Sequence, residues 1–286
     1  MKSIIGQKNL LHCLKRSVEE SNVARFTIIA GERGSQSNLI APYLANLMKC
    51  DCIVLSDVKV DTMRNMTSQA YQNKQKIIYS IENADTMSPN AKNAILKVVE
   101  EPPNKAYFIM TVNDLSSVPD TLCSRARIYH MESYTPNDIK SYLSSEYGSE
   151  STTDTLRIAG KVCKTPGEVD ILMNMGAVDF YEYTDSVLYE IVNEIGAKNL
   201  ALLDKLSVKE DDGKYDIALF LHLFQKLCLD KSYSKESLEN GMSEKYLRAA
   251  FSTSAFKADL RIRGINNKSL VDTWCLLMRQ IFRHGD

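Results

Sequence analysis

Residues 26–48 read FTIIAGERGSQSNLIAPYLANLM, and this stretch decides the fold. The apolar run at 26–30 predicts a short strand, Gly31 and Gly34 predict a turn, and residues 39–48 predict a helix. A strand that turns through glycines into a helix is the setting of a phosphate-binding P-loop, whose backbone N–H groups point at the phosphates. We therefore expect a P-loop architecture here.

The side chains of a working P-loop are missing from this turn. Ser37 stands at the position of the lysine that reaches the β- and γ-phosphates, and Asn38 stands at the position of the hydroxyl that binds Mg²⁺. We expect Gly31, Gly34, Ser37 and Asn38 to form a degenerate cofactor site, and we expect no ATP hydrolysis by this chain alone. The sequence leaves open whether the backbone of the loop still holds a phosphate.

Strands and helices alternate to residue 134. Short apolar runs predict further strands at 52–55, 76–81, 107–112 and 128–131, and helical patterns lie at 9–20, 61–73 and 89–101. This alternation predicts an α/β domain with a parallel sheet covered by helices on both faces. Ligands of such sheets bind beyond the carboxyl ends of the strands, where we expect Gly31, Glu82 and Asn113.

From Thr135 onward the pattern is helical. Thr135 is a suitable N-cap and Pro136 suits the first helical position. Residues 135–177 predict two or three short helices, and residues 178–286 predict longer helices, no strand and an exposed loop at 207–213. Two apolar stripes predict buried helix faces: Ile217, Phe220, Leu221, Phe224, Leu227 and Cys228 in one, and Leu270, Trp274, Leu277, Met278 and Ile281 in the other.

Composition limits the class of protein. The net charge of −1 gives no overall basic field of the kind that would indicate nucleic-acid binding by itself. No apolar run approaches the ~20 residues of a membrane span, and the N-terminus has no signal-peptide pattern. We expect a cytoplasmic protein with no membrane partner.

The seven cysteines are odd in number and widely spaced, which argues against a disulfide framework and predicts buried, reduced thiols. Cys50 and Cys52 are the one close pair. A zinc site needs about four ligands, usually as two pairs. Because no second pair lies nearby in the sequence, we expect no metal site.

Two polar residues follow the predicted strand at 76–81. Glu82 and Asn83 stand where P-loop ATPases carry the acid that positions Mg²⁺ and the acid that polarises the attacking water. An amide has no carboxylate to accept a proton, so Asn83 is a poor general base. By itself, this run could equally be a core strand with a polar end.

Motifs further along the chain carry a resemblance to a known family. They are Asn93-Ala-Ile-Leu-Lys97, Glu100-Glu-Pro-Pro103 and Ser124-Arg-Ala126, with Ile5-Gly-Gln7 near the start. Together they resemble the AAA+ clamp-loader subunits of bacterial DNA polymerase III. The resemblance implies an AAA+ P-loop domain at 1–134, a helical lid domain at 135–177 and an all-α collar domain for oligomerisation at 178–286.

Within this family the chain is most similar to the δ′-type subunit, which commonly lacks the loop lysine and keeps the Ser-Arg motif. The resemblance implies that Arg125, beside Ser124, acts in trans as an arginine finger on ATP and Mg²⁺ held by a neighbouring subunit. A guanidinium offers permanent charge and forked donors to a γ-phosphate. The implied partners are motor (tau/gamma-type) and delta-type subunits, the sliding clamp and primer–template DNA. The implied function is clamp loading within the DNA polymerase III (nucleotidyltransferase) holoenzyme, without a cofactor or activity of its own.

Other family positions point the same way. Thr111 and Asn113 fall in the sensor 1 segment, where we expect them to satisfy hydrogen bonds at a strand end. Glu168 stands where a sensor 2 arginine is usual, and a carboxylate there would repel phosphate. The chain departs from the family in lacking its four-ligand zinc module and in carrying Ala126 instead of a cysteine.

Alternatives remain open. The chain could be a divergent AAA+ ATPase, such as a motor-type subunit, that binds ATP itself through Glu82 and Arg33, or it could bind nucleotide without hydrolysis. Lys92, Lys97 and Lys105 could face DNA phosphates, but a solvated helix face is the favoured interpretation.

Overall fold

A computed structural model describes residues 3–193, 203–207, 215–259 and 267–283 of the chain. It contains two compact units, Met1–Tyr134 and Thr135–Asp286. The predicted division into three domains stays a prediction.

The first unit is an α/β unit with the predicted parallel sheet. Its strands lie in the order β2-β3-β4-β1-β5, and every neighbouring pair is parallel. The strands are β1 (Phe26–Ala30), β2 (Asp51–Leu55), β3 (Ile77–Ile81), β4 (Ala106–Val112) and β5 (Arg127–His130). Each strand begins and ends within one residue of the predicted range.

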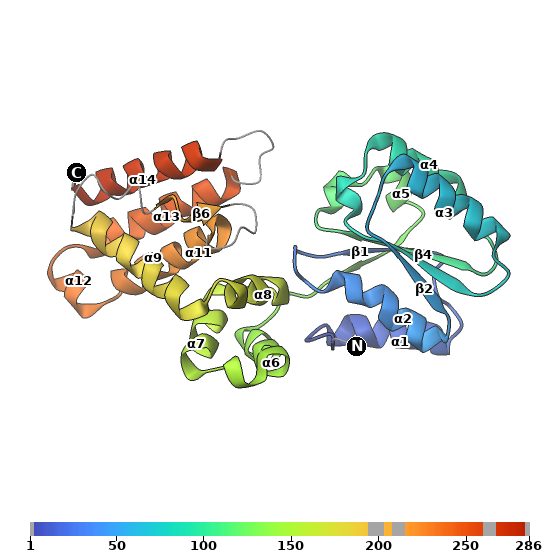
Figure 1. The fold of residues 1–286 in the computed structure, drawn as a ribbon, viewed down its shortest axis with the longest axis horizontal. Coiled ribbons are helices and arrows are strands. Elements are labelled where there is room, and N and C mark those ends of the chain that lie inside the picture. Colours follow the sequence, from blue (N-terminus) through green and yellow to red (C-terminus); the bar gives the residue numbers. More distant parts are fainter. Residues whose placement is uncertain (1–2, 194–202, 208–214, 260–266, 284–286) are drawn as a thin grey trace. The chain divides into compact units, whose positions relative to one another are not determined.

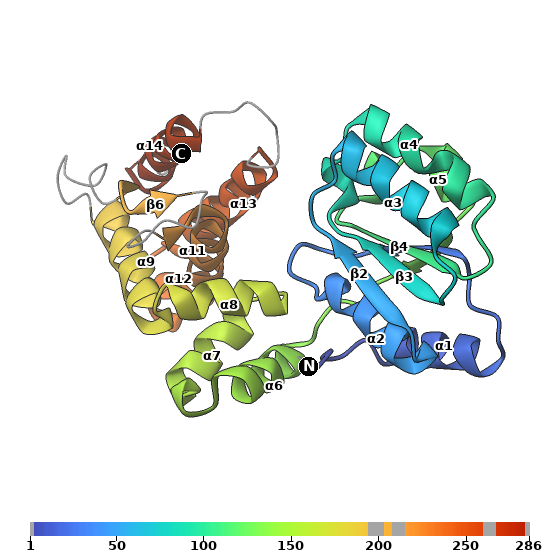
Figure 2. The same cartoon turned by 45° about the vertical axis from the view of Figure 1, so that its right-hand side comes forward.

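Helices cover both faces of this sheet. They are α1 (Lys8–Glu19), α2 (Ile40–Met48), α3 (Val60–Gln72), α4 (Pro89–Glu100) and the short α5 (Asp120–Cys123). Short 3₁₀ turns are η1 (Ser37–Leu39), η2 (Ala84–Thr86) and η3 (Leu115–Ser117). Figures 1 and 2 show α3 and α4 on one face and α1 and α2 on the other.

An apolar core lies under each layer of helices, which explains why β1 and β3 are buried at every position. Ile28 of β1 belongs to the core that contains Met63 and Val98 of α3 and α4. Ile29, the next residue, belongs to the core that contains Leu44 of α2. Successive side chains of a strand point to opposite faces, so a sheet covered on both sides buries all of them.

The register brings the strand ends to one edge of the sheet. Ala30, the last residue of β1, pairs with Val112 of β4 and His130 of β5. Leu55 of β2 pairs with Ile81 of β3. The segments that follow these residues therefore leave from the same carboxyl edge, where ligands of parallel sheets bind.

The second unit is built mainly of helices. They are α6 (Pro136–Tyr147), α7 (Thr153–Val162), α8 (Pro166–Asn174), α9 (Ala177–Val192), α11 (Ile217–Ser232), α12 (Lys235–Glu239), α13 (Ser243–Asp259) and α14 (Asn267–Arg283), with the 3₁₀ turn η4 (Gly148–Glu150) (Figure 1). The predicted start of α6 is confirmed, with Pro136 in its first turn and a capping box between Thr135 and Asp138. In this box the Thr135 hydroxyl accepts from the Asp138 N–H, and the Asp138 carboxylate accepts from the Thr135 N–H.

Aromatic rings fill the core of the second unit. Trp274 of α14 meets Phe220 and Phe224 of α11 edge to face, with ring centroids 5.5 and 4.7 Å apart. The Trp274 indole N–H donates to the Thr253 hydroxyl at 3.1 Å. The predicted stripe on α11 is buried, and the stripe on α14 is buried or partly buried, so both predicted faces are confirmed.

The prediction of no strand after residue 135 is wrong in one detail. β6 (Leu206–Ser207) and β7 (Tyr215–Asp216) pair over two residues. A pair this short has too few residues to produce an alternating pattern. Beyond Ser207, the loop predicted at 207–213 lies outside the described residues. Among the described helices, none has the length and apolar character needed to cross a membrane.

Candidate functional site

The glycine turn after β1 closes on itself. The Ser35 N–H donates to the Glu32 carbonyl at 3.0 Å, and Gly34 takes a left-handed conformation with φ 81°. The Gly31 N–H continues the sheet by donating to the Val112 carbonyl at 3.0 Å. A P-loop binds phosphate through inward-pointing N–H groups. Here the loop itself already uses the N–H of Ser35.

Gln36 is a residue of this loop that the sequence interpretation missed. It stands where the P-loop motif has its second glycine, directly before the lysine position. It keeps the left-handed backbone of such a position, with φ 60°, although it has a side chain. That side chain is buried, accepts from the Ile5 N–H at 3.1 Å and donates to the Ser3 carbonyl at 3.3 Å. Comparing the motif glycine by glycine would have identified it.

The far side of the loop is held as well. The Tyr134 hydroxyl donates to the Ser35 carbonyl at 2.5 Å. Gly31 has no room for a side chain, because a Cβ there would lie 2.5 Å from Met131 Cγ and 2.6 Å from Ser35 Oγ. The loop is therefore packed against the N-terminal segment and the segment that follows β5.

Ser37 and Asn38 lie next to each other on this loop, and their role in a degenerate cofactor site stays a prediction. Ser37 begins the 3₁₀ turn η1, and Asn38 is exposed beside it. Neither side chain has the permanent positive charge of the P-loop lysine.

At the end of β3, Glu82 and Asn83 lie where the sequence predicted. The Glu82 carboxylate accepts from the Ser56 hydroxyl at 3.1 Å. Asn83 has a left-handed backbone with φ 52°, and its N–H donates to the Thr111 hydroxyl at 3.1 Å. Thr111 thus satisfies a hydrogen bond at the strand end, which confirms the expectation for this residue.

Asp85 of η2, an acid that the sequence interpretation did not assign, contacts the end of β4. Its carboxylate accepts from the Asn113 backbone N–H at 2.9 Å and from the Asn113 side-chain amide at 3.1 and 3.3 Å. Asn113 therefore also satisfies hydrogen bonds at a strand end, as expected. In the sequence, Asp85 is only a carboxylate three residues after Glu82, which is a weak signal by itself. Its contact with the sensor 1 residue Asn113 becomes visible in the structure.

Arg125 follows α5 and is held by its own chain. Its Nη1 donates to the Thr121 carbonyl at 2.7 Å and to the Ser124 hydroxyl at 3.3 Å. Its Nη2 lies 2.7 Å from Glu100 Oε1, at the end of α4. The Arg125 side chain keeps 38% of its surface exposed. The guanidinium is thus both fixed and accessible.

Glu168 lies in the first turn of α8, whose N-cap is Thr165. The Glu168 N–H donates to the Thr165 hydroxyl at 3.3 Å, and the Glu168 carboxylate accepts from the Lys164 N–H at 2.6 Å. Both hydrogen bonds stabilise the start of α8. The role of Glu168 at a sensor 2 position stays a prediction.

The interpretation of Lys92 is wrong. Lys92 is only 8% exposed, and its ammonium donates to the Ser117 carbonyl at 2.6 Å, so it does not belong to a solvated face. α4 turns this side chain toward η3, which a single-helix pattern does not reveal. Lys97 is exposed, and the Lys105 ammonium donates to the Lys74 carbonyl at 2.7 Å.

The cysteines are free thiols, but they are not all buried. Cys13 is exposed, because it lies on the outer side of α1, whereas Cys163, Cys228 and Cys275 are buried. Burial raises the pKa of Cys52 to about 11, which keeps that thiol protonated at neutral pH. Within the described ranges, no cluster of three or more His, Cys, Asp or Glu residues could hold a metal. The absence of a metal stays a prediction.

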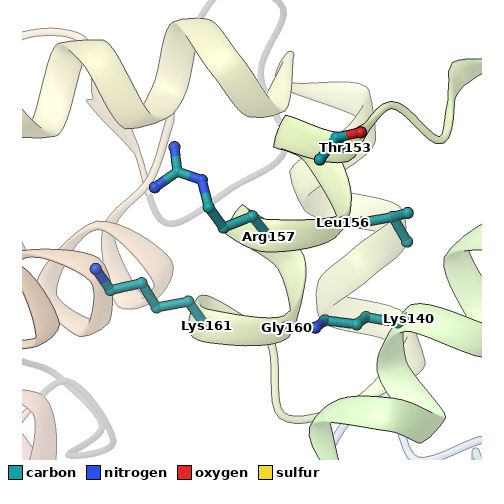
Figure 3. A pocket seen from close by; sticks show the side chains of 6 residues that line it. All are labelled: Lys140, Thr153, Leu156, Arg157, Gly160 and Lys161. Atoms are coloured by element: carbon teal, nitrogen blue, oxygen red, sulfur yellow. The ribbon is translucent and has the colours of Figure 1, made fainter.

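A pocket of about 550 Å³ lies in the second unit, and none of the predicted site residues lines it. Lys140 of α6 and residues of α7 line it, and Figure 3 shows Arg157 and Lys161 projecting from successive turns in the same direction. Arg157 lies 3.8 Å from Asp154, and Lys161 forms an ion pair with Asp230. These carboxylates neutralise the charges of two of the three cationic side chains that line the pocket. We therefore assign the pocket no ligand.

Comparison with known proteins identifies relatives that are named as subunits of DNA polymerase III. The family model described as "DNA polymerase III, delta subunit" matches residues 52–135. DNA polymerase III subunit gamma of Buchnera aphidicola subsp. Acyrthosiphon pisum is 23% identical over 172 residues, covering 50% of this chain and 48% of the relative. DNA polymerase III subunit delta' of Haemophilus influenzae is 30% identical over 86 residues, covering 29% of this chain and 25% of the relative.

A crystal structure of a DNA polymerase III gamma subunit-related protein from Thermotoga maritima has the same fold. Its TM-score is 0.52 at 16% identity, over 96% of this chain and 99% of that one. At this identity the likeness concerns the fold alone, and it agrees with the predicted α/β unit with a parallel sheet followed by a helical part. The chain spans about half the length of the gamma relative that it matches.

Proposed function

We propose, from the premise that this chain belongs to the clamp-loader family of DNA polymerase III, that it is a δ′-type subunit without ATPase activity of its own. It assists in loading a sliding clamp onto primer–template DNA, together with motor (tau/gamma-type) and delta-type subunits. It supplies Arg125 in trans to ATP and Mg²⁺ that a neighbouring motor subunit holds.

The observation that carries this proposal is a contrast between two parts of the first unit. The loop that would hold a nucleotide lacks its lysine, and Gln36 and Tyr134 tie it to neighbouring segments. Arg125, by comparison, is fixed by its own chain and keeps 38% of its surface exposed. A subunit that acts on a neighbour's nucleotide needs an exposed and fixed arginine, but it does not need a nucleotide-binding loop of its own.

The end of β3 supports the absence of hydrolysis. The position of the catalytic acid holds Asn83, whose N–H is bound to Thr111. An amide accepts no proton, so it cannot act as the base for an attacking water. An arginine finger, by contrast, increases the rate of hydrolysis about 10³–10⁵-fold, as judged from the rate lost when it is removed.

The second candidate is a motor-type subunit that binds ATP itself. A relative that matches half of this chain is named DNA polymerase III subunit gamma, which favours the motor-type candidate. This candidate requires Glu82 to hold Mg²⁺ and another cation to replace the loop lysine. Arg33 is the nearest cation in the loop sequence.

Calorimetry and turnover measurements on the isolated full chain with ATP and Mg²⁺ separate these candidates. We expect no heat of binding, no ATP-dependent change in melting temperature and no phosphate release. Phosphate release that disappears in a Ser37→Ala variant would overturn the silent-subunit proposal in favour of the motor-type candidate. Binding without release would show that the loop backbone still holds a nucleotide.

A further inference from the structure

We propose that Glu100 is a positioning residue that holds the Arg125 guanidinium in the orientation used on the neighbouring subunit's nucleotide. This inference rests on the proposed function of Arg125. The two side chains are 25 residues apart in sequence, yet Arg125 Nη2 lies 2.7 Å from Glu100 Oε1. Both stay accessible, with 38% of the arginine and 44% of the glutamate side chain exposed.

Glu100 is one of three residues of the same chain that contact the Arg125 guanidinium. The other contacts are to the Thr121 carbonyl at 2.7 Å and the Ser124 hydroxyl at 3.3 Å, and both use Nη1. Glu100 alone engages Nη2, so it sets the rotation of the planar group about its long axis. A guanidinium has five N–H donors in a rigid fork. Within the described chain, its Nε–H has no acceptor and is left for an external oxygen.

The position of Glu100 is not explained by helix stability. Glu101 precedes Pro102, and a residue before proline avoids the helical conformation, so α4 ends at Glu100. The carboxyl end of a helix carries partial negative charge and disfavours an acid there. The cation of Arg125 compensates this charge. The Glu-Glu-Pro-Pro and Ser-Arg motifs are therefore joined through space.

The expected consequence concerns the reaction rate more than folding. Arginine side chains have large rotamer freedom, and a fork that is ordered in advance loses less of it when it meets the phosphate. Small misplacements of a catalytic group can lower rates about 10²-fold. A half-exposed ion pair contributes little to stability. Removing Glu100 should therefore affect the motor's turnover while the subunit stays folded.

The test uses the full chain reconstituted with motor and delta-type subunits, sliding clamp and primed DNA. We expect Glu100→Gln to lower the kcat of ATP hydrolysis about three- to thirtyfold, with KM and melting temperature unchanged. Glu100→Asp should recover part of the loss. Glu101→Gln is the matched control, because Glu101 is the exposed neighbour at the end of the same helix. It should behave as the wild type.

The Arg125→Ala variant separates the two proposals. In that background, Glu100→Gln should cause no further loss, since it acts only through Arg125. If Arg125→Ala lowers kcat and Glu100→Gln leaves it unchanged or raises it, the positioning role is wrong and the arginine finger stands. If Arg125→Ala itself has no effect, the proposed function fails, and the positioning role fails with it.

Discussion

Gln7 joins the first residues of the chain to the end of the sheet. Its side chain is 1% exposed, donates to the Glu132 carbonyl at 2.8 Å and accepts from the Glu132 N–H at 2.7 Å. It pairs both backbone groups of one residue, as a neighbouring strand would. Gln7 thereby fixes the N-terminal segment, which in turn holds the Gln36 side chain through Ser3 and Ile5.

We predict that Gln7→Ala lowers the free energy of unfolding of the first unit by about 2 kcal/mol, because it leaves two backbone groups without partners. Lys8→Ala is the control, because Lys8 is exposed. Urea unfolding followed by circular dichroism measures the change. Trp274, the single tryptophan, lies in the second unit, so its fluorescence should keep the wild-type midpoint. An unchanged dichroism midpoint would show that Gln7 does not hold this segment.

At the scale of elements, a buried histidine links α11 and α13. His222 Nδ1 lies 2.7 Å from the Lys257 ammonium, whose N–H groups also reach Gln225 at 3.3 Å. Burial, followed by the charges of Lys257, Lys164 and Lys226, lowers the pKa of His222 from 6.5 to about 3. Between pH 6.5 and about 3, the folded protein therefore keeps this imidazole neutral, whereas the unfolded chain protonates it.

The sign of the pH dependence follows from this difference. Between pH 6.5 and about 3 the unfolded state binds the extra proton, so stability falls as the pH is lowered. The limit is about 1.4 kcal/mol per pH unit. We predict that His222→Gln removes this contribution to the slope of the free energy of unfolding against pH. Urea unfolding at a series of pH values, followed by Trp274 fluorescence, measures this slope. His12→Gln, on the exposed side of α1, should keep it, and an identical slope in both variants would exclude His222 as the cause.

The elements of the first unit could be predicted because their patterns are local. The run at Phe26–Ala30 is mostly apolar on both alternating sets of positions and is followed by Gly31, which identifies a strand covered on both faces. Thr135 and Pro136 mark the start of α6 in the same way. The site was predicted less completely. Gln36 could have been found by counting along the P-loop motif, but the contact between Glu100 and Arg125 joins two segments that no local pattern connects.

At the scale of the whole molecule, the first unit has the parallel sheet and the glycine turn expected of a P-loop fold, but not its nucleotide-binding side chains. The turn after β1 is packed from both sides, by Gln36 toward the N-terminal segment and by Tyr134 from the segment after β5. The end of β3 offers an amide where a base is needed. Arg125, by contrast, is held by contacts within its own chain and keeps part of its surface exposed. The division of labour between subunits that we propose would explain this combination.

The most direct measurement of this division is ATP hydrolysis by the complex reconstituted from the full chain, motor and delta-type subunits, clamp and primed DNA. We predict that Arg125→Ala lowers single-turnover hydrolysis at the motor site beside this chain about 10³-fold, while the complex still assembles. Arg127→Ala is the matched control, since Arg127 is an exposed arginine two residues away whose Nη1 contacts the Asn22 carbonyl. It should hydrolyse ATP as the wild type does. An assembled Arg125→Ala complex with wild-type hydrolysis and clamp loading would contradict the account.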